Sequence, residues 1–480
     1  MHLLHFKPAD GYVGDVIPFY NSGEYHVFYL KRREGLDDSP SVQPLIWAHA
    51  VSTDLIHWEE LPNALEVGGP EDPDSRGCWT GSVIKSGRTF HIFYTGYSAG
   101  QGNYPPQTIC HATSQDLIRW DKNASNPIIV PDPRWYENDD WRDPFVFWNE
   151  KEKCYWMLIT ARVKDASTPR RGCIAIAKSK DLKAWSVHPP LWKPYLIYAP
   201  ECPDLFQMNG KWYLIFSNVA TRYRYAEDLS GPWRRYPIAS FDGEKYYAAK
   251  TLYDGKRRLL FGWIASQENE RDEGKWEWGG HMALPREIFA RFDGSLGIRC
   301  PEEIIKAFKR EKIKPGSSLQ YEFGTGSWHF KNESFVGNAD DGFAFIRFPN
   351  VPDNYLLEAE ITLDSMIASA GFMIRMSENL EGGYMLTLEP YAHRAAFRYW
   401  KPWGDPSPHI ERPLDIQPGQ PVKCQIFLED TLLEAFFDDR TAISARMYNF
   451  RKGQLCLFVQ NGKADFSHLR LAPLLDKACS

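Results

Sequence analysis

Long apolar runs are missing from this 480-residue sequence. No stretch of 18 consecutive apolar residues occurs, and the opening "MHLLHFKPADG" has no basic segment followed by an apolar one. Membrane-spanning helices need about 20 apolar residues, and secretory signals need an apolar stretch behind a charged one. The sequence therefore predicts neither a membrane span nor a signal peptide, and we expect a cytoplasmic protein.

Cysteine is present, but not in patterns that bind metals or form a disulfide framework. The nine cysteines are scattered, with no Cys-x-x-Cys pair and no histidine at zinc-finger spacing. Such a set is typical of reduced, mostly buried thiols in a cytoplasmic protein. We expect no disulfide framework, no metal site and no cofactor.

Long blocks of charge of one sign are also absent. Lys plus Arg number 56 and Asp plus Glu number 62, which gives a net charge of −6. Nucleic acids and anionic membranes attract concentrated positive charge, so both are poor partner candidates for this chain. Aromatic residues, in contrast, reach 15% with 18 Trp. This content suits packed β-structure as well as flat faces that stack on sugar rings.

Two sequence repeats organise the first 290 residues or so. Alternating apolar segments recur as "EYHVFYLKR", "TFHIFYTGY", "CYWMLITAR", "KWYLIFSN" and "RRLLFGW", centred on Phe28, Phe93, Leu158, Ile215 and Phe261. Between them lie "STDLIHW", "SQDLIRW", "SKDLKAW" and a degenerate "AEDLSGPW". The Ser and Asp of this second repeat are typical of turns, and we expect its Trp to pack between units. Five units of about four strands each predict a five-bladed β-propeller, a closed all-β architecture.

The innermost strand of each blade should begin beside the propeller axis, so that its first residues point into a shared funnel. Asp15, Trp79, Asp143, Glu201 and Tyr247 lie 13 to 15 residues before the five centres. We therefore expect them at equivalent positions. Two aromatic residues and three acids would then surround one pocket.

Three carboxylates at one axis repel each other, a cost that folding alone does not require. Any one of them could be a turn cap at a strand start, but three in register favour a functional site. A hard cation needs about six oxygen ligands, and no Asp- or Asn-rich loop accompanies these acids. Hydrolysis of a glycosidic bond needs two carboxyl groups that flank the bond, one of them protonated. The pattern favours a glycosidase in which the third acid holds ring hydroxyls.

Several motifs, in order along the chain, resemble glycoside hydrolase family 32, the β-fructosidases. They are "HFKPADGYVGD", "SGEYHVFYL", "WAHAVSTDLIHW", "WTGSV", "WRDPFVF", "PECPDLF" and "HMALPRE". Residues 429–472 are similar to the C-terminal β-sandwich of that family. The resemblance thus covers nearly the whole chain, and its most specific pieces are the Arg-Asp-Pro and Glu-Cys triplets.

The resemblance implies a role for each of the three acids. Asp15 matches the nucleophile that attacks the anomeric carbon of a fructofuranosyl unit. Asp143 matches the acid that binds two sugar hydroxyls and stabilises the transition state, and Glu201 matches the acid/base that protonates the leaving oxygen. Arg142 would pair with these acids and help to set their protonation.

The resemblance also implies a set of pocket-lining residues. Trp47, Trp79 and Thr80 stand where the family places them, although Trp47 fits packing within a blade equally well. Tyr247 joins the expected substrate-binding residues as the fifth residue of the ring.

The first motif departs from the family pattern, Trp-Met-Asn-Asp-Pro-Asn-Gly. Here Gly14 replaces the Asn before the acid, the following Pro-Asn-Gly is gone, and Leu30 stands where the family has a sugar-binding Gln. A site that hydrogen-bonds a hydroxyl discriminates strongly, so we expect both changes to relax or shift recognition of the fructosyl unit.

The chain length and a change of pattern near Cys300 predict a second domain, since a single core stops growing near about 250–300 residues. We assign residues 1–298 to the propeller, 299–315 to a charged and partly helical connector, and 316–480 to a β-sandwich of two antiparallel sheets. A monomer or a homodimer is expected.

Three functions remain open at this level. The first is a retaining hydrolase of β-fructofuranosides, such as sucrose or short fructo-oligosaccharides, with or without fructosyl transfer. The second is a furanosidase of another specificity, for instance an arabinofuranosidase, on the same propeller. The third is a sugar-binding protein without catalytic activity.

Overall fold

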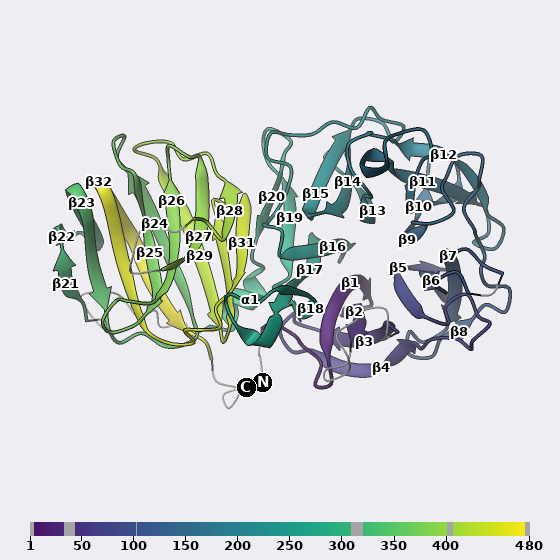
Figure 1. The fold of residues 1–480 in the computed structure, drawn as a ribbon, viewed down its shortest axis with the longest axis horizontal. Helices are drawn as coiled ribbons and strands as arrows, with labels where there is room; N and C mark the ends of the chain where they lie inside the picture. Colours follow the sequence, from purple (N-terminus) through teal and green to yellow (C-terminus); the bar gives the residue numbers. More distant parts are fainter. Residues whose placement is uncertain (1–3, 33–43, 102, 309–319, 401–406, 476–480) are drawn as a thin grey trace.

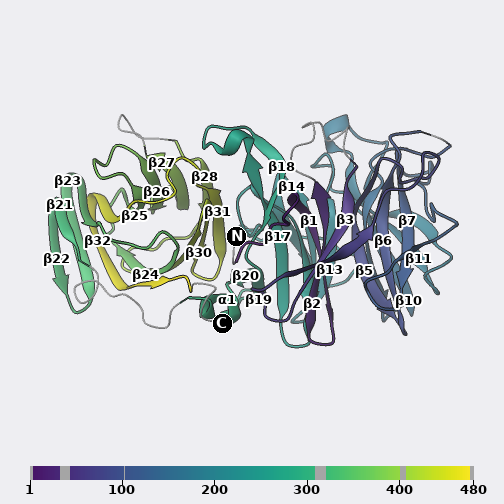
Figure 2. The ribbon, with the colours of Figure 1, turned by 90° about the horizontal axis from the view of Figure 1, so that it is seen from below.

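The computed structural model describes residues 4–32, 44–101, 103–308, 320–400 and 407–475. A ring of short strands lies beside a second all-β unit (Figure 1), and Figure 2 shows the same two units side by side from below. No helix in these ranges is long and apolar enough to cross a membrane. The five-bladed propeller followed by a β-sandwich is confirmed.

Blades one to three each contain four antiparallel strands. They are β1 (Tyr12–Asn21), β2 (Glu24–Arg32), β3 (Ile46–Ser52) and β4 (Glu59–Leu65); β5 (Gly77–Ser86), β6 (Thr89–Tyr97), β7 (Gln107–Ser114) and β8 (Asp121–Lys122); and β9 (Arg142–Asn149), β10 (Cys154–Arg162), β11 (Gly172–Ser179) and β12 (Ser186–Trp192). A short 3₁₀ turn, Thr168–Arg170, interrupts the connection from β10 to β11.

Blades four and five complete the ring. Their strands are β13 (Glu201–Met208), β14 (Lys211–Asn218) and β15 (Ala220–Ala226), then β16 (Tyr246–Tyr253), β17 (Arg258–Gln267), β18 (Trp276–Met282), β19 (Arg286–Ala290) and β20 (Leu296–Arg299). Strand β18 follows a second 3₁₀ turn, Glu268–Glu270, and pairs with both β17 and β1. Blades one and five are therefore hydrogen-bonded, which closes the ring and protects their edges.

The second repeat forms the turns that lock neighbouring blades together. In the first copy the Ser52 hydroxyl accepts hydrogen bonds from the backbone N–H groups of Asp54 and Leu55. The Asp54 carboxylate accepts those of Ile56 and His57. The Trp of each full copy then packs edge-on against the central Phe of the preceding blade: Trp58 on Phe261, Trp120 on Phe28 and Trp185 on Phe93. The expected packing of these tryptophans between units is confirmed.

The short helix α1 (Glu302–Lys306) follows the propeller, and residues 309–315 of the expected connector lie outside the described residues. The strands of the second unit are β21 (Glu322–Thr325), β22 (Ser327–Lys331), β23 (Ser334–Phe348), β24 (Tyr355–Leu363), β25 (Ser369–Met376), β26 (Gly383–Glu389), β27 (Arg394–Trp400), β28 (Ile410–Pro413), β29 (Pro421–Glu429), β30 (Leu432–Phe437), β31 (Thr441–Arg446) and β32 (Gln454–Pro473).

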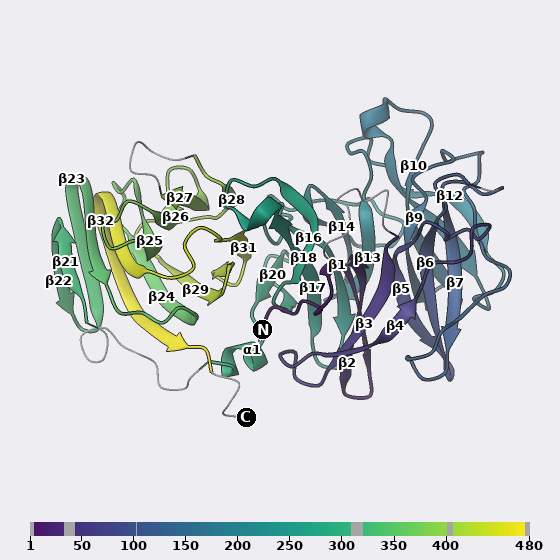
Figure 3. The same ribbon diagram turned by 60° about the horizontal axis from the view of Figure 1, so that its bottom comes forward.

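The two layers of the sandwich are joined rather than separate as expected. Strand β32 pairs with β23 and β25 along its first half and with β24 along its second, so the hydrogen bonds run through one 12-stranded sheet. The reason is the length of β32: a strand that bends through register shifts can belong to both layers. Figure 3 shows this long strand crossing the unit.

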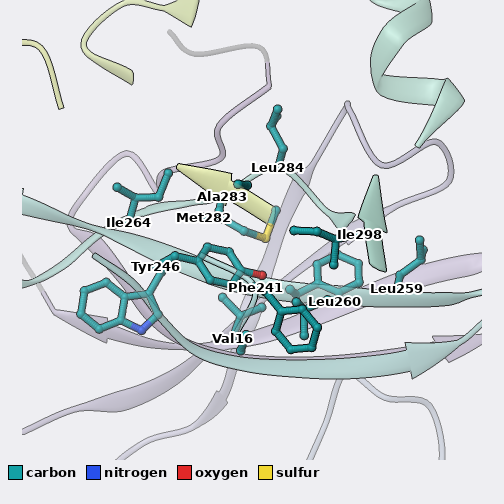
Figure 4. Close-up of a cluster of buried hydrophobic side chains, with 14 of the residues drawn as sticks. Val16, Phe241, Tyr246, Leu259, Leu260, Ile264, Met282, Ala283, Leu284 and Ile298 are labelled. Carbon is teal, nitrogen blue, oxygen red and sulfur yellow. The ribbon is translucent and has the colours of Figure 1, made fainter. Parts of the chain in front are cut away.

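The propeller core continues into the sandwich. In the cluster of Figure 4, Val16, Tyr246, Leu260 and Met282 pack together, and the same cluster includes Phe436 of the sandwich. Burial of apolar side chains contributes about 25 cal/mol per Å², so this shared core stabilises the two units together.

A buried ionic network reinforces that interface. The Arg286 guanidinium, fully buried, donates to Asp242 at 2.7 Å and to Glu434 at 2.6 Å. His5 bridges Glu429 at 2.8 Å and Glu434 at 3.0 Å. Burial alone would lower the pKa of His5, but the two carboxylates raise it to about 9. The imidazolium therefore ties the start of the propeller to the sandwich.

Candidate active site

The innermost strand of every blade carries one extra residue near its start. The register between the first and second strands shifts between Val13 and Val16, between Trp79 and Gly81, and at the corresponding points of β9, β13 and β16. Such bulges bend a strand and redirect its side chains. These bulges surround the centre of the ring, where β1, β5, β9, β13 and β16 begin (Figure 1).

The expected equivalence of the five ring residues is wrong in register. Glu201 and Tyr247 precede the bulge of their blades, as Arg142 does in blade three. Asp143 is the first bulged residue and has φ +58°, whereas Asp15 is the second bulged residue of its own blade. The three acids thus occupy three successive positions, from the residue before the bulge to the second bulged residue. They nevertheless converge, because a bulge turns consecutive side chains toward the same side.

Asp15 is partly buried and held by three side chains from other blades. Trp263 of β17 donates its indole N–H to one carboxylate oxygen at 3.1 Å. Thr80 of β5 donates its hydroxyl to the other oxygen, and the Cys202 thiol lies 3.5 Å from that same oxygen. These bonds fix the carboxylate without covering it.

The electrostatic surroundings of Asp15 oppose its ionisation. Loss of water contact raises its pKa most, the bond from Thr80 lowers it, and the nearby charges of Asp143 and Glu201 raise it further, to about 6. The ionised form of Asp15 is therefore less favoured than that of a carboxyl in water. Its charge disappears as the pH falls through about 6.

Asp143 is buried close to Asp15. One carboxylate oxygen accepts the backbone N–H of Cys202 at 2.9 Å and the Thr160 hydroxyl at 3.2 Å. Burial raises the pKa of Asp143, and the guanidinium of Arg142 opposes that shift. The carboxylate is thus fixed in direction, which suits a group that accepts hydrogen bonds from a ligand.

Glu201 keeps 33% of its side chain accessible, whereas Asp143 is buried. Arg142 donates to one of its oxygens at 2.9 Å, and the Tyr247 hydroxyl donates to the other. Arg142 also donates to Asp140, so the guanidinium is shared among acids. An exposed carboxyl with fixed donors is well placed to exchange a proton with a ligand and then with water.

Two of the predicted pocket-lining residues are buried. Trp47 is fully buried, and its indole N–H donates to the backbone carbonyl of Trp79 at 2.9 Å, so it cannot touch a ligand. Thr80 is also buried, at 1% exposure, because its hydroxyl points to Asp15. Trp79 itself is half-buried and stacks on Tyr97 with ring centres 4.1 Å apart. Trp47 and Thr80 are therefore positioning residues.

The departures from the family motif have a structural explanation. A Cβ atom on Gly14 would lie 2.2 Å from Cη2 of Trp278, because this half-buried indole from β18 occupies the space beside the glycine. Leu30 is buried in the cluster between blades one and two, against which Trp278 packs. Trp278 thus takes the place of a side chain next to Asp15, while Leu30 faces the core.

Sequence reasoning missed Trp263, Cys202 and Trp278. A signal existed for Trp263: it lies two residues after the repeat centre Phe261, so strand alternation places both side chains on one face. The role of Trp278 had no such signal, because β18 belongs to blade five and reaches Gly14 only through the closure of the ring. Among the residues that the structure describes, no group of three His, Cys, Asp or Glu could hold a metal ion.

Comparison with known proteins agrees with this geometry. Residues 5–296 match the family model "Glycosyl hydrolases family 32 N-terminal domain". An insoluble β-fructofuranosidase isoenzyme of Arabidopsis thaliana is 26% identical over 92% of this chain and 86% of its own, and a fructan 1-exohydrolase of Triticum urartu is 25% identical over 93% and 82%. The fold is similar to that of an exo-inulinase from Aspergillus awamori, with a TM-score of 0.75 and 19% identity over 99% of this chain and 98% of the other.

Proposed function

The chain belongs to family 32 of the glycosyl hydrolases, and from that premise we propose that it is a retaining β-fructofuranosidase acting on sucrose or short fructo-oligosaccharides. The observation that carries the proposal is the convergence of Asp15, Asp143 and Glu201 in three different environments. Neighbouring carboxyl groups in unlike environments are the usual arrangement of glycosidases.

The proposed reaction proceeds in two displacements. In the first, Asp15 attacks the anomeric carbon of the fructofuranosyl unit, while the carboxyl proton of Glu201 passes to the departing glycosidic oxygen. A covalent fructosyl ester on Asp15 results. In the second, Glu201 takes a proton from water, the resulting hydroxide displaces Asp15, and fructose leaves. An alcohol in place of the water would give fructosyl transfer.

The surrounding residues support each step. Thr80 and Trp263 hold Asp15 in a single orientation by donating to both of its oxygens. Tyr247 and Arg142 hold Glu201 at the exposed side of the cluster, where a leaving group departs and water enters. Asp143 accepts sugar hydroxyls, and these bonds strengthen as positive charge develops on the ring.

The proposal includes a cytoplasmic location. Eight cysteines in the described residues are free and buried, a pattern that is common where thiols stay reduced. Cell fractionation of the native host tests this part: activity in the cytosolic fraction is expected, and activity bound to the cell wall or in the medium would contradict it.

A substrate panel tests the activity. Purified protein should release fructose from sucrose and 1-kestose, and Asp15→Asn should lower the rate by at least about a thousandfold, since no other residue replaces the nucleophile. A matched control is Asp132→Asn, a carboxylate that pairs with the exposed Arg134. Release of arabinose from an aryl arabinofuranoside without release of fructose from any fructoside would contradict the proposal.

A further inference from the structure

A second hollow lies on the sandwich, on the face of the sheet that points away from the sandwich core. Its volume is about 640 Å³, within the range of about 300–1,000 Å³ typical of small-molecule sites. Five neighbouring strands, β23, β32, β25, β26 and β27, contribute to it. Strand alternation explains the separation of faces: Met385 and Thr387 line the hollow, whereas Leu386 between them packs into the core.

Aromatic rings form one side of this hollow. Phe343 and Trp400 lie with ring centres 6.0 Å apart and planes 32° apart, and Phe343 also stacks on Phe458. The Trp400 indole N–H donates to the backbone carbonyl of Leu380 at 2.6 Å, which fixes the ring. Trp400 and Phe343 remain partly exposed, so a rigid apolar platform borders the cavity.

The rest of the lining is mostly polar, and its charged groups are paired. Glu389 accepts from Arg394 at 2.7 Å, from the Thr387 hydroxyl at 2.6 Å and from Arg398. Arg394 is also paired with Glu411. Glu411 lies outside the lining, but with Glu389 it leaves each guanidinium of the hollow paired with a carboxylate. A charged ligand such as a phosphate would have to break these pairs, whereas a neutral ligand would not.

The remaining polar group is an amide. Gln460 on β32 accepts a hydrogen bond from the Ser369 hydroxyl at 3.1 Å and is partly exposed at the cavity. Its NH₂ group can donate to a ligand, while the hydroxyls of Ser369 and Thr387 can accept. Hydrogen-bond donors and acceptors therefore line the hollow together with the apolar platform.

This combination fits a neutral polyhydroxylated ring. A sugar has C–H faces that pack on aromatic rings and hydroxyls that both donate and accept. We infer that the hollow lined by Phe343, Trp400, Gln460 and the Glu389 cluster is a second carbohydrate-binding site, and that it takes a segment of an oligomeric β-fructoside. The ligand class rests on the proposed function, since a second site for the same substrate increases its effective concentration at the funnel.

Binding of nystose, a neutral fructose-containing tetrasaccharide, to the full-length Asp15→Asn protein tests the inference by titration calorimetry. Two sites are expected, one in the funnel and one in the sandwich. Trp400→Ala should weaken the second by at least about tenfold, the loss of about 1.4 kcal/mol of contact. Gln460→Ala removes only an exposed amide and gives the same test if Trp400→Ala does not fold. Trp148→Ala, an exposed tryptophan on β9, is the control.

In otherwise wild-type protein, Trp400→Ala should lower kcat/KM for inulin by about three- to tenfold and leave kcat/KM for sucrose unchanged within about twofold. A single nystose site that persists in both Trp400→Ala and Gln460→Ala, or an unchanged ratio of inulin to sucrose rates, would overturn the inference. The two proposals fail differently. If the funnel does not take fructosides, the Asp15→Asn protein shows one nystose site, and Trp400→Ala removes it. If the hollow does not bind fructosides, the Asp15→Asn protein shows one nystose site, and Trp400→Ala leaves it unchanged.

Discussion

Replacement of Gly14 by Asn is the substitution most sharply predicted by the site. On the sequence pattern alone, Gly14→Asn would restore the amide side chain that the family motif has before its nucleophile. In the structure the position is already filled, because the first atom of any side chain would lie 2.2 Å from Cη2 and 2.3 Å from Cζ2 of Trp278. We therefore expect Gly14→Asn to be harmful rather than restorative.

The size of the effect follows from what must move. Carbon atoms in contact stay at least about 3.5 Å apart, so the indole has to shift by more than about 1 Å. Overpacking of this kind costs about 1–3 kcal/mol. Trp278 packs on Trp263, with ring centres 5.7 Å apart, and Trp263 donates to Asp15. Loss of that bond should lower kcat/KM for sucrose by about ten- to a hundredfold.

A double-mutant cycle measures the clash directly. Trp278→Ala removes the obstructing ring, so Gly14→Asn/Trp278→Ala should be more stable than the sum of the single changes predicts, by about 1–3 kcal/mol in urea unfolding. Gly87→Asn in the β5–β6 turn, where no atom lies within 4 Å of a Cβ, is the control. Additive effects, or a Gly14→Asn protein with wild-type stability and rates, would refute the reasoning.

Three further changes probe other parts of the molecule. Thr80→Val removes a hydroxyl that favours the ionised form of Asp15, so the acid limb of the kcat/KM profile near pH 6 should move to higher pH, with a loss of about tenfold at pH 6; an unmoved limb would contradict this role. His5 has a pKa raised to about 9 in the folded state, so its contribution, on the order of 3 kcal/mol, is fully present below pH 6.5 and lost as the pH rises through 9. Urea midpoints should therefore fall between pH 7 and 10 in the wild type but less in His5→Gln, and equal slopes would refute the linkage. Trp120→Ala should cost about 2–3 kcal/mol by opening a cavity against Phe28, and a loss below about 0.5 kcal/mol would show that this tryptophan does not anchor two blades.

The blades could be predicted because their sequence signals are local. A segment such as "TFHIFYTGY" alternates over one strand, and the Ser-x-Asp turn is made of contacts between residues at most a few positions apart. The tryptophan of that turn repeats with each blade, so its partner in the preceding blade repeats as well. Regular repetition makes each unit evidence for the others.

The register of the acids could not be predicted, because a bulge adds a residue without changing the alternating pattern on either side. A spacing of 13 to 15 residues before the centres does not distinguish the positions around a bulge. The sequence pattern therefore gives Asp15, Asp143 and Glu201 equivalent positions. The same limit applies to Trp47, whose burial depends on a hydrogen bond to the backbone of Trp79 in the next blade. Contacts between blades become visible only when the ring is assembled.

The sandwich was predictable as a domain but not as a partner of the propeller. Alternating strands after Cys300 indicated antiparallel sheets, yet nothing local in the sequence pairs His5 with Glu429 and Glu434. These contacts join opposite ends of the chain, and charged residues near either end are ordinarily solvated. Their role depends on burial that two folded units create together.

The anomeric configuration of the first transfer product tests the double-displacement mechanism most directly. With methanol added to a sucrose reaction, a fructosyl ester on Asp15 must be attacked from the face that glucose left, so ¹H and ¹³C NMR should show methyl β-fructofuranoside as the first methyl product. This product does not mutarotate, so its configuration persists through the measurement. Methyl α-fructofuranoside formed first would mean a single displacement with inversion, and it would contradict the assignment of Asp15 as the nucleophile.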